Sequence, residues 1–319
     1  MAKTKEIQRR IKSVNNTKKI TRAMEMVAAA KMHKAVAAVL RTRTYSNLAW
    51  MTILNIAGAS NTNKYLHPLL STRDTVKRVA IVLISSNRGL CGSFNTNVIN
   101  KAVASIKKHG NVETDFFVIG KKGFAVNTRY GYPVKAVFEK FDQKSDIKEV
   151  YSVAKMVIDG FSSGVYDKVF VAFTDFVSAT KQIPRVKQLL PVDLNTDKEY
   201  LGVVGQDALV GISKEYIAEK EAKYLNSEGY KYIFEYEPSS EEVLNQMIPR
   251  LIEVQLLQAT LESVASEHSV RMATMHQATE AADDLVKELV LFYNKARQSA
   301  ITSEIAEISA GANALKKGY

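Results

Sequence analysis

The two ends of the chain carry the hydrophobic pattern of long helices. From about Lys3 to Ala57 there is neither proline nor glycine, and alanine, methionine, lysine, arginine and glutamate are frequent. These residues favour helix, so we expect one helix of roughly 80 Å at 1.5 Å per residue. Its apolar positions indicate a buried stripe that turns around the axis at Asn15–Thr17. The stripe begins as Ile7, Ile11 and Val14 and continues as Ile20, Met24, Val27 and Ala28.

A second long helix is predicted at the other end of the chain. Ser239 and Glu242 have the spacing of a capping box and follow Pro238, which marks a helix start. Pro249 predicts a kink or a restart, and no further proline or glycine occurs before Gly311. Apolar residues then recur in alternating steps of four and three, which is a heptad repeat. Its positions are Leu257, Leu261, Val264, His268, Arg271, Met275, Ala278, Ala282, Leu285, Leu289, Phe292 and Ala296.

A heptad repeat of this length requires a partner helix. The N-terminal helix is the other long helix in the chain, so we expect the two ends to pair as an antiparallel coiled coil. Ala278 and Ala282 are small, however, and His268 and Arg271 interrupt the apolar stripe near its middle. Two explanations stay open at this stage. The interruption is either a matter of packing, through poor packing or through a long side chain that snorkels out to water, or it is a contact with an outside partner.

The middle of the chain has the pattern of an α/β domain. Apolar runs at Val79–Ile84, Asp115–Ile119 and Lys168–Phe173 are typical of buried strands, and helical stretches at 97–108 and 146–161 separate them. This alternation predicts a Rossmann-like domain with a largely parallel sheet, inserted between the terminal helices. We divide the chain into helix 1–58, α/β domain 74–235 and helix 239–315. Within the domain, 193–229 is irregular, with a possible short helix at 214–225, and is interpreted as an excursion.

The loop Asn87-Arg-Gly-Leu-Cys-Gly92 lies where a doubly wound fold binds ligands. Its glycine spacing matches neither the dinucleotide turn nor the phosphate loop, and Gly120–Gly123 fails the same tests. Cys91 is either a reactive thiol beside Arg88 or a small residue packed in a turn. No GxSxG motif is present, and neither the one cysteine nor the five histidines have the spacing of metal ligands. We therefore expect no catalytic site, cofactor or metal.

The net charge of +11 is concentrated at the N-terminus, where the first 43 residues hold 12 basic and 2 acidic side chains. Lys3, Lys5, Arg9 and Arg10 lie at the positive end of the helix dipole, where cations are unfavourable. This placement suggests an acidic partner surface. No aromatic residue precedes Tyr45, which argues against a base-stacking nucleic-acid site. No apolar run could cross a bilayer and no signal peptide is evident, so we expect a cytosolic or peripheral protein.

Three stretches closely resemble the gamma subunits of F-type ATP synthases. They are Ile7–Val14 with Asn16-Thr-Lys-Lys-Ile-Thr-Arg-Ala-Met-Glu-Met-Val-Ala-Ala-Ala-Lys-Met32, the loop Asn87–Gly92, and Tyr293-Asn-Lys-Ala-Arg-Gln-Ser-Ala-Ile-Thr-Ser-Glu-Ile-Ala-Glu-Ile308 with Gly311–Leu315. The resemblance covers both ends of the chain and the first strand and turn of the middle domain, in the expected order.

The resemblance implies a non-catalytic central rotor stalk. In that family the coiled coil inserts into the ring of alpha and beta subunits, while the α/β domain and the epsilon subunit form a foot on the membrane ring of c subunits. Ion-driven rotation of that ring changes the nucleotide affinity of the catalytic sites in turn. The contacts with the catch loops of beta would carry over to Met24, Lys18, Lys19, Arg271, Gln298 and Thr302. The implied location is peripheral, on the cytoplasmic face of a bacterial plasma membrane, with no nucleic-acid partner.

The chain departs from the family pattern in several places. Asn87 stands where Asp is usual, Ser93 where a second Gly is common, and Ala278–Ala282 reads Ala-Thr-Glu-Ala-Ala where the family has Ala-Thr-Asp-Asn-Ala. The single cysteine excludes the thiol regulation of chloroplast members. Two other classes stay open: a soluble α/β enzyme dimerised by its helices, and a basic coiled-coil scaffold that binds nucleic acid or an anionic membrane.

Overall fold

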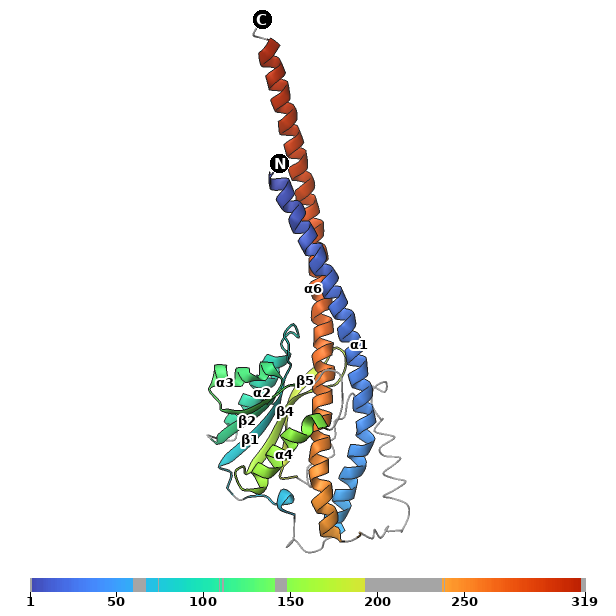
Figure 1. Ribbon diagram of the computed structural model, residues 1–319, viewed down its shortest axis with the longest axis vertical. Helices are drawn as coiled ribbons and strands as arrows, with labels where there is room; N and C mark the ends of the chain where they lie inside the picture. The colour runs from blue at the N-terminus through green and yellow to red at the C-terminus, as the bar shows by residue number, and fades with distance from the viewer. Residues whose placement is uncertain are drawn as a thin grey trace. The chain divides into compact units, whose positions relative to one another are not determined.

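The computed structural model contains two long helices and a five-stranded sheet with shorter helices in the part of the chain that it describes (Figure 1). The structure describes residues 2–59, 67–73, 75–108, 110, 112–140, 148–192, 237 and 239–316. The predicted excursion at 193–229, with its short helix at 214–225, lies outside these residues. The chain divides into two compact units: residues 1–29 with 271–319, and residues 30–270.

Both long helices form as predicted. Helix α1 spans Ala2–Ala59 and helix α6 spans Ser240–Lys316. The hydroxyl of Ser239 accepts a hydrogen bond from the N–H of Glu242 at 3.2 Å, which caps α6 as the sequence indicated. The prediction of a helix restart at Pro249 was wrong, because α6 runs through this residue without interruption. The flanking Ile248 and Leu251 are fully buried, so tertiary packing outweighs the one hydrogen bond that proline removes.

The sheet has the strand order β3-β2-β1-β4-β5. Strands β1 (Arg78–Ile84), β2 (Glu113–Ile119), β3 (Val134–Phe138) and β4 (Lys168–Phe176) are parallel, and β5 (Gln182–Leu190) is antiparallel to β4. The three predicted strands correspond to β1, β2 and β4. Sequence reasoning missed β3, which is short, and β5, which contains Pro184 and polar residues.

Helices cover both faces of the sheet, which is the arrangement of a doubly wound α/β domain. Val79, Ile81 and Leu83 of β1 pack with α2 (Phe94–Lys108) on one face. The alternate residues, such as Val82, pack on the other face with α4 (Lys148–Ser162), α6 and part of α1. Because neighbouring side chains of β1 point to opposite buried faces, the strand is apolar at every position from Val79 to Ile84.

Three short elements of the described chain lie between the larger ones: the first precedes β1, and the other two connect β2 to β3. They are η1 (Pro68–Leu70), η2 (Lys121–Phe124) and α3 (Ala125–Tyr130). Gly120, which precedes η2, has φ +95, and a Cβ there would lie 2.4 Å from the carbonyl oxygen of Ser85. This glycine therefore lets the turn after β2 approach the turn after β1.

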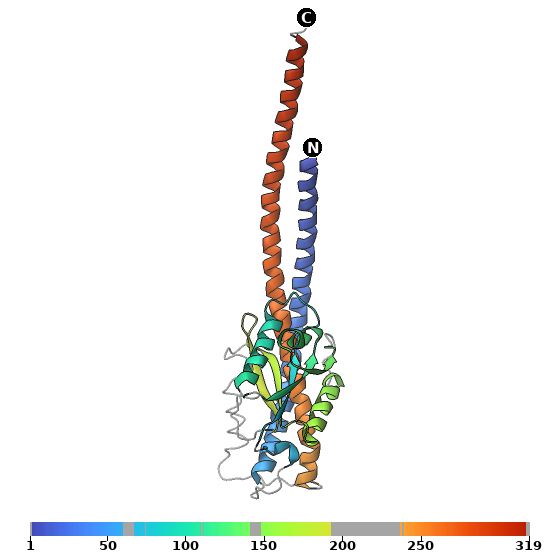
Figure 2. The same cartoon turned by 90° about the vertical axis from the view of Figure 1, so that its left-hand side faces the viewer.

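In the first unit, the early residues of α1 and the late residues of α6 run side by side and antiparallel (Figures 1 and 2). This arrangement confirms the predicted pairing of the two ends.

Candidate functional site

The inner face of α1 follows a straight heptad stripe in the first unit. Its positions, all buried or half-buried, are Ile7, Ile11, Val14, Lys18, Thr21, Glu25 and Ala28. The predicted turn of the stripe was wrong, since Ile20 is 61% exposed and Val27 is 56% exposed. The heptad continues through polar residues, which a search for apolar positions passes over.

Three polar side chains of this stripe meet polar side chains of α6. We call the three cross-helix pairs the polar ladder: Lys18–Asp283, Thr21–Thr279 and Glu25–His276. The first pair is an ion pair of 2.5 Å, the second a hydroxyl bond of 2.8 Å, and the third a contact of 3.2 Å to Nδ1 of the imidazole. Numbers rise along α1 as they fall along α6, so the polar ladder fixes the antiparallel register of the two helices.

The charges at one end of the polar ladder stabilise one another. The hydrogen bond from Lys18, and then its charge, hold the pKa of Asp283 below its ordinary value. Lys287 lies 3.4 Å from Asp283 and 2.9 Å from Asp284, and its bond to Asp284 raises its own pKa. Both shifts favour the charged forms of Asp283 and Lys287.

The heptad stripe of α6 is buried in its first part and open in its last part. Leu257, Leu261 and Met275 are each less than 5% exposed, whereas Leu285 and Phe292 are 44% and 54% exposed. Every residue from 301 to 313 is exposed. In Figure 1 this part of α6 extends past the end of α1. The end of α6 is thus a helix without a cover in the described structure.

The six predicted partner contacts differ in how accessible they are. Arg271 is only 9% exposed, and Lys18 is held by Asp283. Met24 is half-buried, while Lys19, Gln298 and Thr302 are exposed. The burial of Arg271 favours the packing explanation for the interruption of the heptad. It leaves little of the guanidinium for an outside partner.

Of these six residues, Gln298 and Thr302 form the clearest joint surface. They lie one turn apart on one side of α6, and the hydroxyl of Thr302 donates to the carbonyl oxygen of Gln298 at 2.9 Å. Arg271 lies 27 residues earlier on the same helix, a separation of roughly 40 Å. The residues therefore occupy different levels of the helix pair and cannot form one compact site.

The loop after β1 is held by bonds within the protein. The N–H of Ser86 donates to Asn95 at 2.9 Å, and that of Phe94 donates to Cys91 at 3.2 Å, so these donors are not presented to a phosphate. Cys91 is 2% exposed and lies 3.3 Å from the side-chain nitrogen of Asn95. This burial favours the packed-turn interpretation of Cys91 over the reactive thiol.

Asn87 ties this loop to the end of β3. Its side-chain nitrogen donates to the carbonyl oxygen of Lys140, and its side-chain oxygen accepts from the N–H of the same residue at 3.3 Å. An amide can both donate and accept, whereas a carboxylate only accepts. The asparagine that stands in place of the usual aspartate is therefore explained by its two bonds to one backbone residue.

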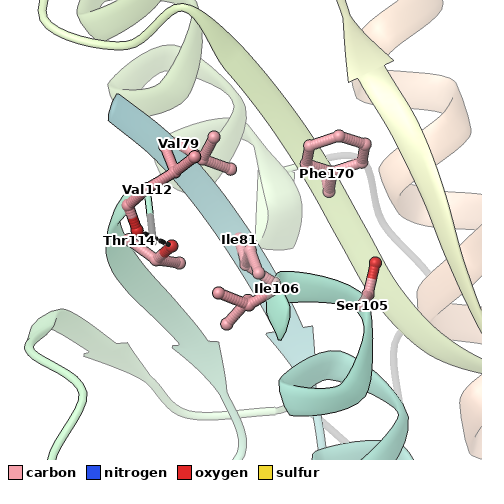
Figure 3. A pocket seen from close by; sticks show the side chains of 7 residues that line it. All are labelled: Val79, Ile81, Ser105, Ile106, Val112, Thr114 and Phe170. Atoms are coloured by element: carbon pink, nitrogen blue, oxygen red, sulfur yellow. Dashed lines mark hydrogen bonds between the residues drawn. The ribbon is translucent and has the colours of Figure 1, made fainter. Parts of the chain in front are cut away.

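A small pocket lies between α2 and the amino ends of the strands (Figure 3). Its lining has two hydroxyls and no charged side chain, and consists of Val79, Ile81, Ser105, Ile106, Val112, Thr114 and Phe170. One hydroxyl is used internally, since Thr114 donates to the carbonyl oxygen of Val112 at 3.0 Å. Doubly wound domains bind nucleotides at the opposite, carboxyl edge. This pocket does not have the chemistry of a nucleotide site.

The described residues also bear on metal binding and on membrane insertion. No group of three or more histidine, cysteine, aspartate or glutamate side chains within this part of the chain could hold a metal ion. Likewise, none of the helices in the described ranges has the length and apolar character needed to span a bilayer.

The fold belongs to a class in which a doubly wound domain lies in sequence between two long terminal helices that pair. Solved structures share it. A chain of the Euglena gracilis mitochondrial ATP synthase, in a structure of OSCP, F1 and the c-ring, matches with a TM-score of 0.63 at 16% identity, covering 99% of this chain and 96% of that one. A chain from the central stalk and c-ring of the Tetrahymena thermophila mitochondrial ATP synthase gives 0.55 at 21% identity, covering 81% and 99%.

Sequence comparison is more specific. The family model for ATP synthase matches residues 3–315. An ATP synthase gamma chain of Coxiella burnetii is 39% identical over 319 residues, with 99% of this chain and 100% of the relative covered. One from Legionella pneumophila is 37% identical over 318 residues with the same coverage. The chain belongs to the family of ATP synthase gamma chains. It is thus a non-catalytic subunit with the role of a central rotor stalk.

Proposed function

We propose that the exposed end of α6 is the part of this rotor stalk that turns inside the catalytic head of alpha and beta subunits. The observation that carries the proposal is an uncovered apolar stripe. Ile301, Ile305 and Ile308 are 47%, 61% and 72% exposed and recur at helical spacing on one side of α6. A lone helix with an apolar stripe gains stability only when another surface covers that stripe.

The start of α1 supplies the complementary electrostatic feature. Lys5, Arg9, Arg10 and Lys12 are exposed, and Arg10 forms an ion pair of 3.4 Å with Glu6. Exposed cations near a helix N-terminus are unfavourable unless an anionic surface lies nearby. These residues suit the acidic loops of a surrounding head.

We assign the contacts with the catch loops of beta according to how exposed each of the six side chains is. Gln298, Thr302 and Lys19 would make direct contacts, and Met24 would add its exposed part. Lys18 and Arg271 would act from within the helix pair, because Asp283 holds the first and burial covers the second.

The remaining partners follow from the family. The α/β domain, within residues 74–235, would form a foot with the epsilon subunit on the c ring, while the helices at 1–58 and 239–315 enter the head. The complex would place this chain peripherally on the cytoplasmic face of a bacterial plasma membrane. Ion flow through the ring would then drive ATP synthesis in the head.

A triple substitution tests the role of the end of α6. Ile301→Ser, Ile305→Ser and Ile308→Ser together remove the apolar stripe from residues that are already exposed, so the full chain should keep its far-UV circular dichroism and thermal midpoint. Its yield in complexes with alpha and beta, or the ATP-driven ion pumping of those complexes, should fall at least several-fold.

The matched control is Tyr151→Ser with Met156→Ser on α4, which are 50% and 43% exposed in the α/β domain. This variant should assemble with the head as the wild type does. Normal assembly and pumping by the α6 variant would refute the proposal. ATP turnover by the isolated chain would favour the enzyme alternative, and salt-sensitive retention on nucleic acid or anionic vesicles would favour the scaffold.

A further inference from the structure

One short stretch of α6 is bonded to the carboxyl end of β4 and is connected through Lys140 to the ends of β3 and β1. Ser263 and Ser266 are fully buried on neighbouring turns of the helix. The hydroxyl of Ser263 accepts from the N–H of Thr174 in β4 at 3.1 Å, and the hydroxyl of Ser266 donates to the carbonyl oxygen of Thr174 at 3.2 Å. Two serines thus satisfy both backbone groups of one strand residue.

The pairing of β4 explains why these backbone groups are available. The register of β4 with β1 ends at Ala172, two residues before Thr174. On its other side Thr174 lies opposite Pro184 of β5, which has no N–H to donate. The two serines of α6 therefore take the place of a neighbouring strand at this position. Pro184 is tolerated in β5 because Thr174 directs its bonds to α6 instead.

Ser269 extends the same contact by one more turn. It is fully buried, and its hydroxyl donates to the carbonyl oxygen of Ala179, in the turn between β4 and β5, at 2.6 Å. The side-chain nitrogen of Gln182, the first residue of β5, donates back to Ser269 at 3.2 Å. Three serines at three-residue spacing thus hold the end of β4 and the turn that follows it.

A buried ion pair joins the same stretch of helix to two other strands. The ammonium group of Lys140 bonds to the carboxylate of Glu267, and the two side chains are 1% and 3% exposed. Lys140 follows β3, and its backbone is bonded to Asn87 from the turn after β1. Glu267 is therefore connected through Lys140 to the ends of both β3 and β1.

These contacts differ in kind from the apolar packing around them. Burial of apolar area is non-directional, so it would tolerate small sliding or rotation of a helix on a sheet. Hydrogen bonds weaken steeply with distance and angle, and separating a buried ion pair leaves two uncompensated charges. A buried ion pair adds little net stability compared with apolar residues of the same volume, so its value here lies in fixing position.

We infer that Ser263, Ser266, Glu267 and Ser269, with Lys140, form a clamp that transmits rotation between the α/β domain and helix α6. The inference rests on the proposed function, because a rotor foot is useful only when its rotation reaches the helix that turns in the head. Doubly wound domains place ligands at the carboxyl ends of their strands. Here the helix of the same chain is bonded at that edge.

The test uses the assembled ATP synthase in vesicles and compares ion uptake with ATP hydrolysed. Lys140→Met with Glu267→Leu removes both charges and retains volume, so the chain should fold and assemble. We expect ATP hydrolysis to continue at a rate near that of the wild type, while ion uptake per ATP against an opposing gradient falls at least two-fold. Ser266→Ala with Ser269→Ala is a second, independent variant and should lower the same ratio.

The matched control is Lys121→Gln with Glu139→Gln, an ion pair of 3.0 Å in the same domain whose side chains are 64% and 59% exposed. It should leave the ratio unchanged. Wild-type ratios in both clamp variants would overturn the inference. If the charge variant fails to assemble, the serine variant decides by the same ratio. Failure of the proposed function is distinguishable, since it would appear as normal assembly and pumping by the triple variant of Ile301, Ile305 and Ile308, which leaves the clamp residues unchanged.

Discussion

Replacement of Asn87 by aspartate should destabilise the α/β domain at neutral pH and progressively less in acid. Asn87 donates to the carbonyl oxygen of Lys140 and accepts from its N–H. A carboxylate has acceptors only, so Asn87→Asp keeps the second bond and loses the first. It also places a negative charge against a carbonyl oxygen.

The size of the loss follows from burial. Lys140 is 3% exposed, so water cannot easily replace the lost donor, whereas residue 87 itself is half-buried. Leaving a buried polar group unsatisfied costs about 1–3 kcal/mol, and partial access of water to residue 87 places this case at about 1–2 kcal/mol. Because one pKa unit corresponds to about 1.4 kcal/mol, the new carboxyl should have a pKa raised by roughly one unit over its unfolded value of about 3.9.

The direction of the pH dependence follows from that raised pKa. A protonated carboxyl can donate to the carbonyl oxygen of Lys140 again, so the loss is absent below the unfolded pKa. It develops as the pH rises through the folded pKa, and it is complete by about pH 6. The free energy of unfolding of the variant, subtracted from that of the wild type at each pH, should therefore grow between about pH 4 and pH 6.

Urea unfolding of the full chain, followed by far-UV circular dichroism, measures this difference. Hydrogen exchange in 134–140 locates it, because those amides report local opening at the end of β3. The control is Asn100→Asp in α2, where the side-chain oxygen only accepts a bond from the hydroxyl of Tyr130, at 2.7 Å. Aspartate can keep that bond, so the control should change little.

Two results would refute this reasoning. The first is wild-type stability of Asn87→Asp at pH 7, which would mean that the donor at this position does not hold the end of β3. The second is a loss that stays constant from pH 4 to pH 8, which would mean that the charge state of the new carboxyl is irrelevant. An equal loss in the Asn100 control would point to a general effect of added negative charge.

Three further substitutions test the domain's construction. Gly120→Ala would place a Cβ 2.4 Å from the carbonyl oxygen of Ser85 and should prevent folding, whereas Gly131→Ala, with φ +75 and nothing within 4 Å, should cost only about 1 kcal/mol by urea unfolding. Burial alone would raise the pKa of Asp167, but two backbone N–H groups at the start of β1 and the Arg73 guanidinium hold it below its ordinary value. Asp167→Asn should therefore lower stability at pH 7, and its deficit relative to the wild type should shrink as the pH falls below about 4.

The sequence predicted the main elements because each carries a strong local signal. The continuous apolar runs of β1, β2 and β4 are what burial on both faces of a parallel sheet requires. Strand β5 lacks such a signal, because proline normally argues against a strand. It forms because Pro184 lies opposite Thr174, whose backbone is bonded to α6, and no local pattern could reveal that distant partner.

The helix pair shows a different limit of sequence reasoning. The stripe of α1 was predicted from apolar residues alone, so it was displaced to Ile20 and Val27, which are exposed. The true stripe keeps strict heptad spacing through Lys18, Thr21 and Glu25. A signal was present in the sequence, since the opposing positions on α6 hold complementary groups, but it appears only when both helices are aligned antiparallel.

The loop after β1 lies at the edge of the sheet where the clamp forms. Its glycines and its position after a buried strand suggested a phosphate turn, and the fold does place it at the edge where ligands bind. At that edge the structure instead directs Asn87 to Lys140, and Lys140 to Glu267 of α6. In this doubly wound domain, the edge at which others of the class bind ligands is therefore bonded to a helix of the same chain. The local sequence pattern could predict that this loop lies at the carboxyl edge of the sheet. The contacts of that edge with Glu267, far away in the sequence, are seen only in the fold.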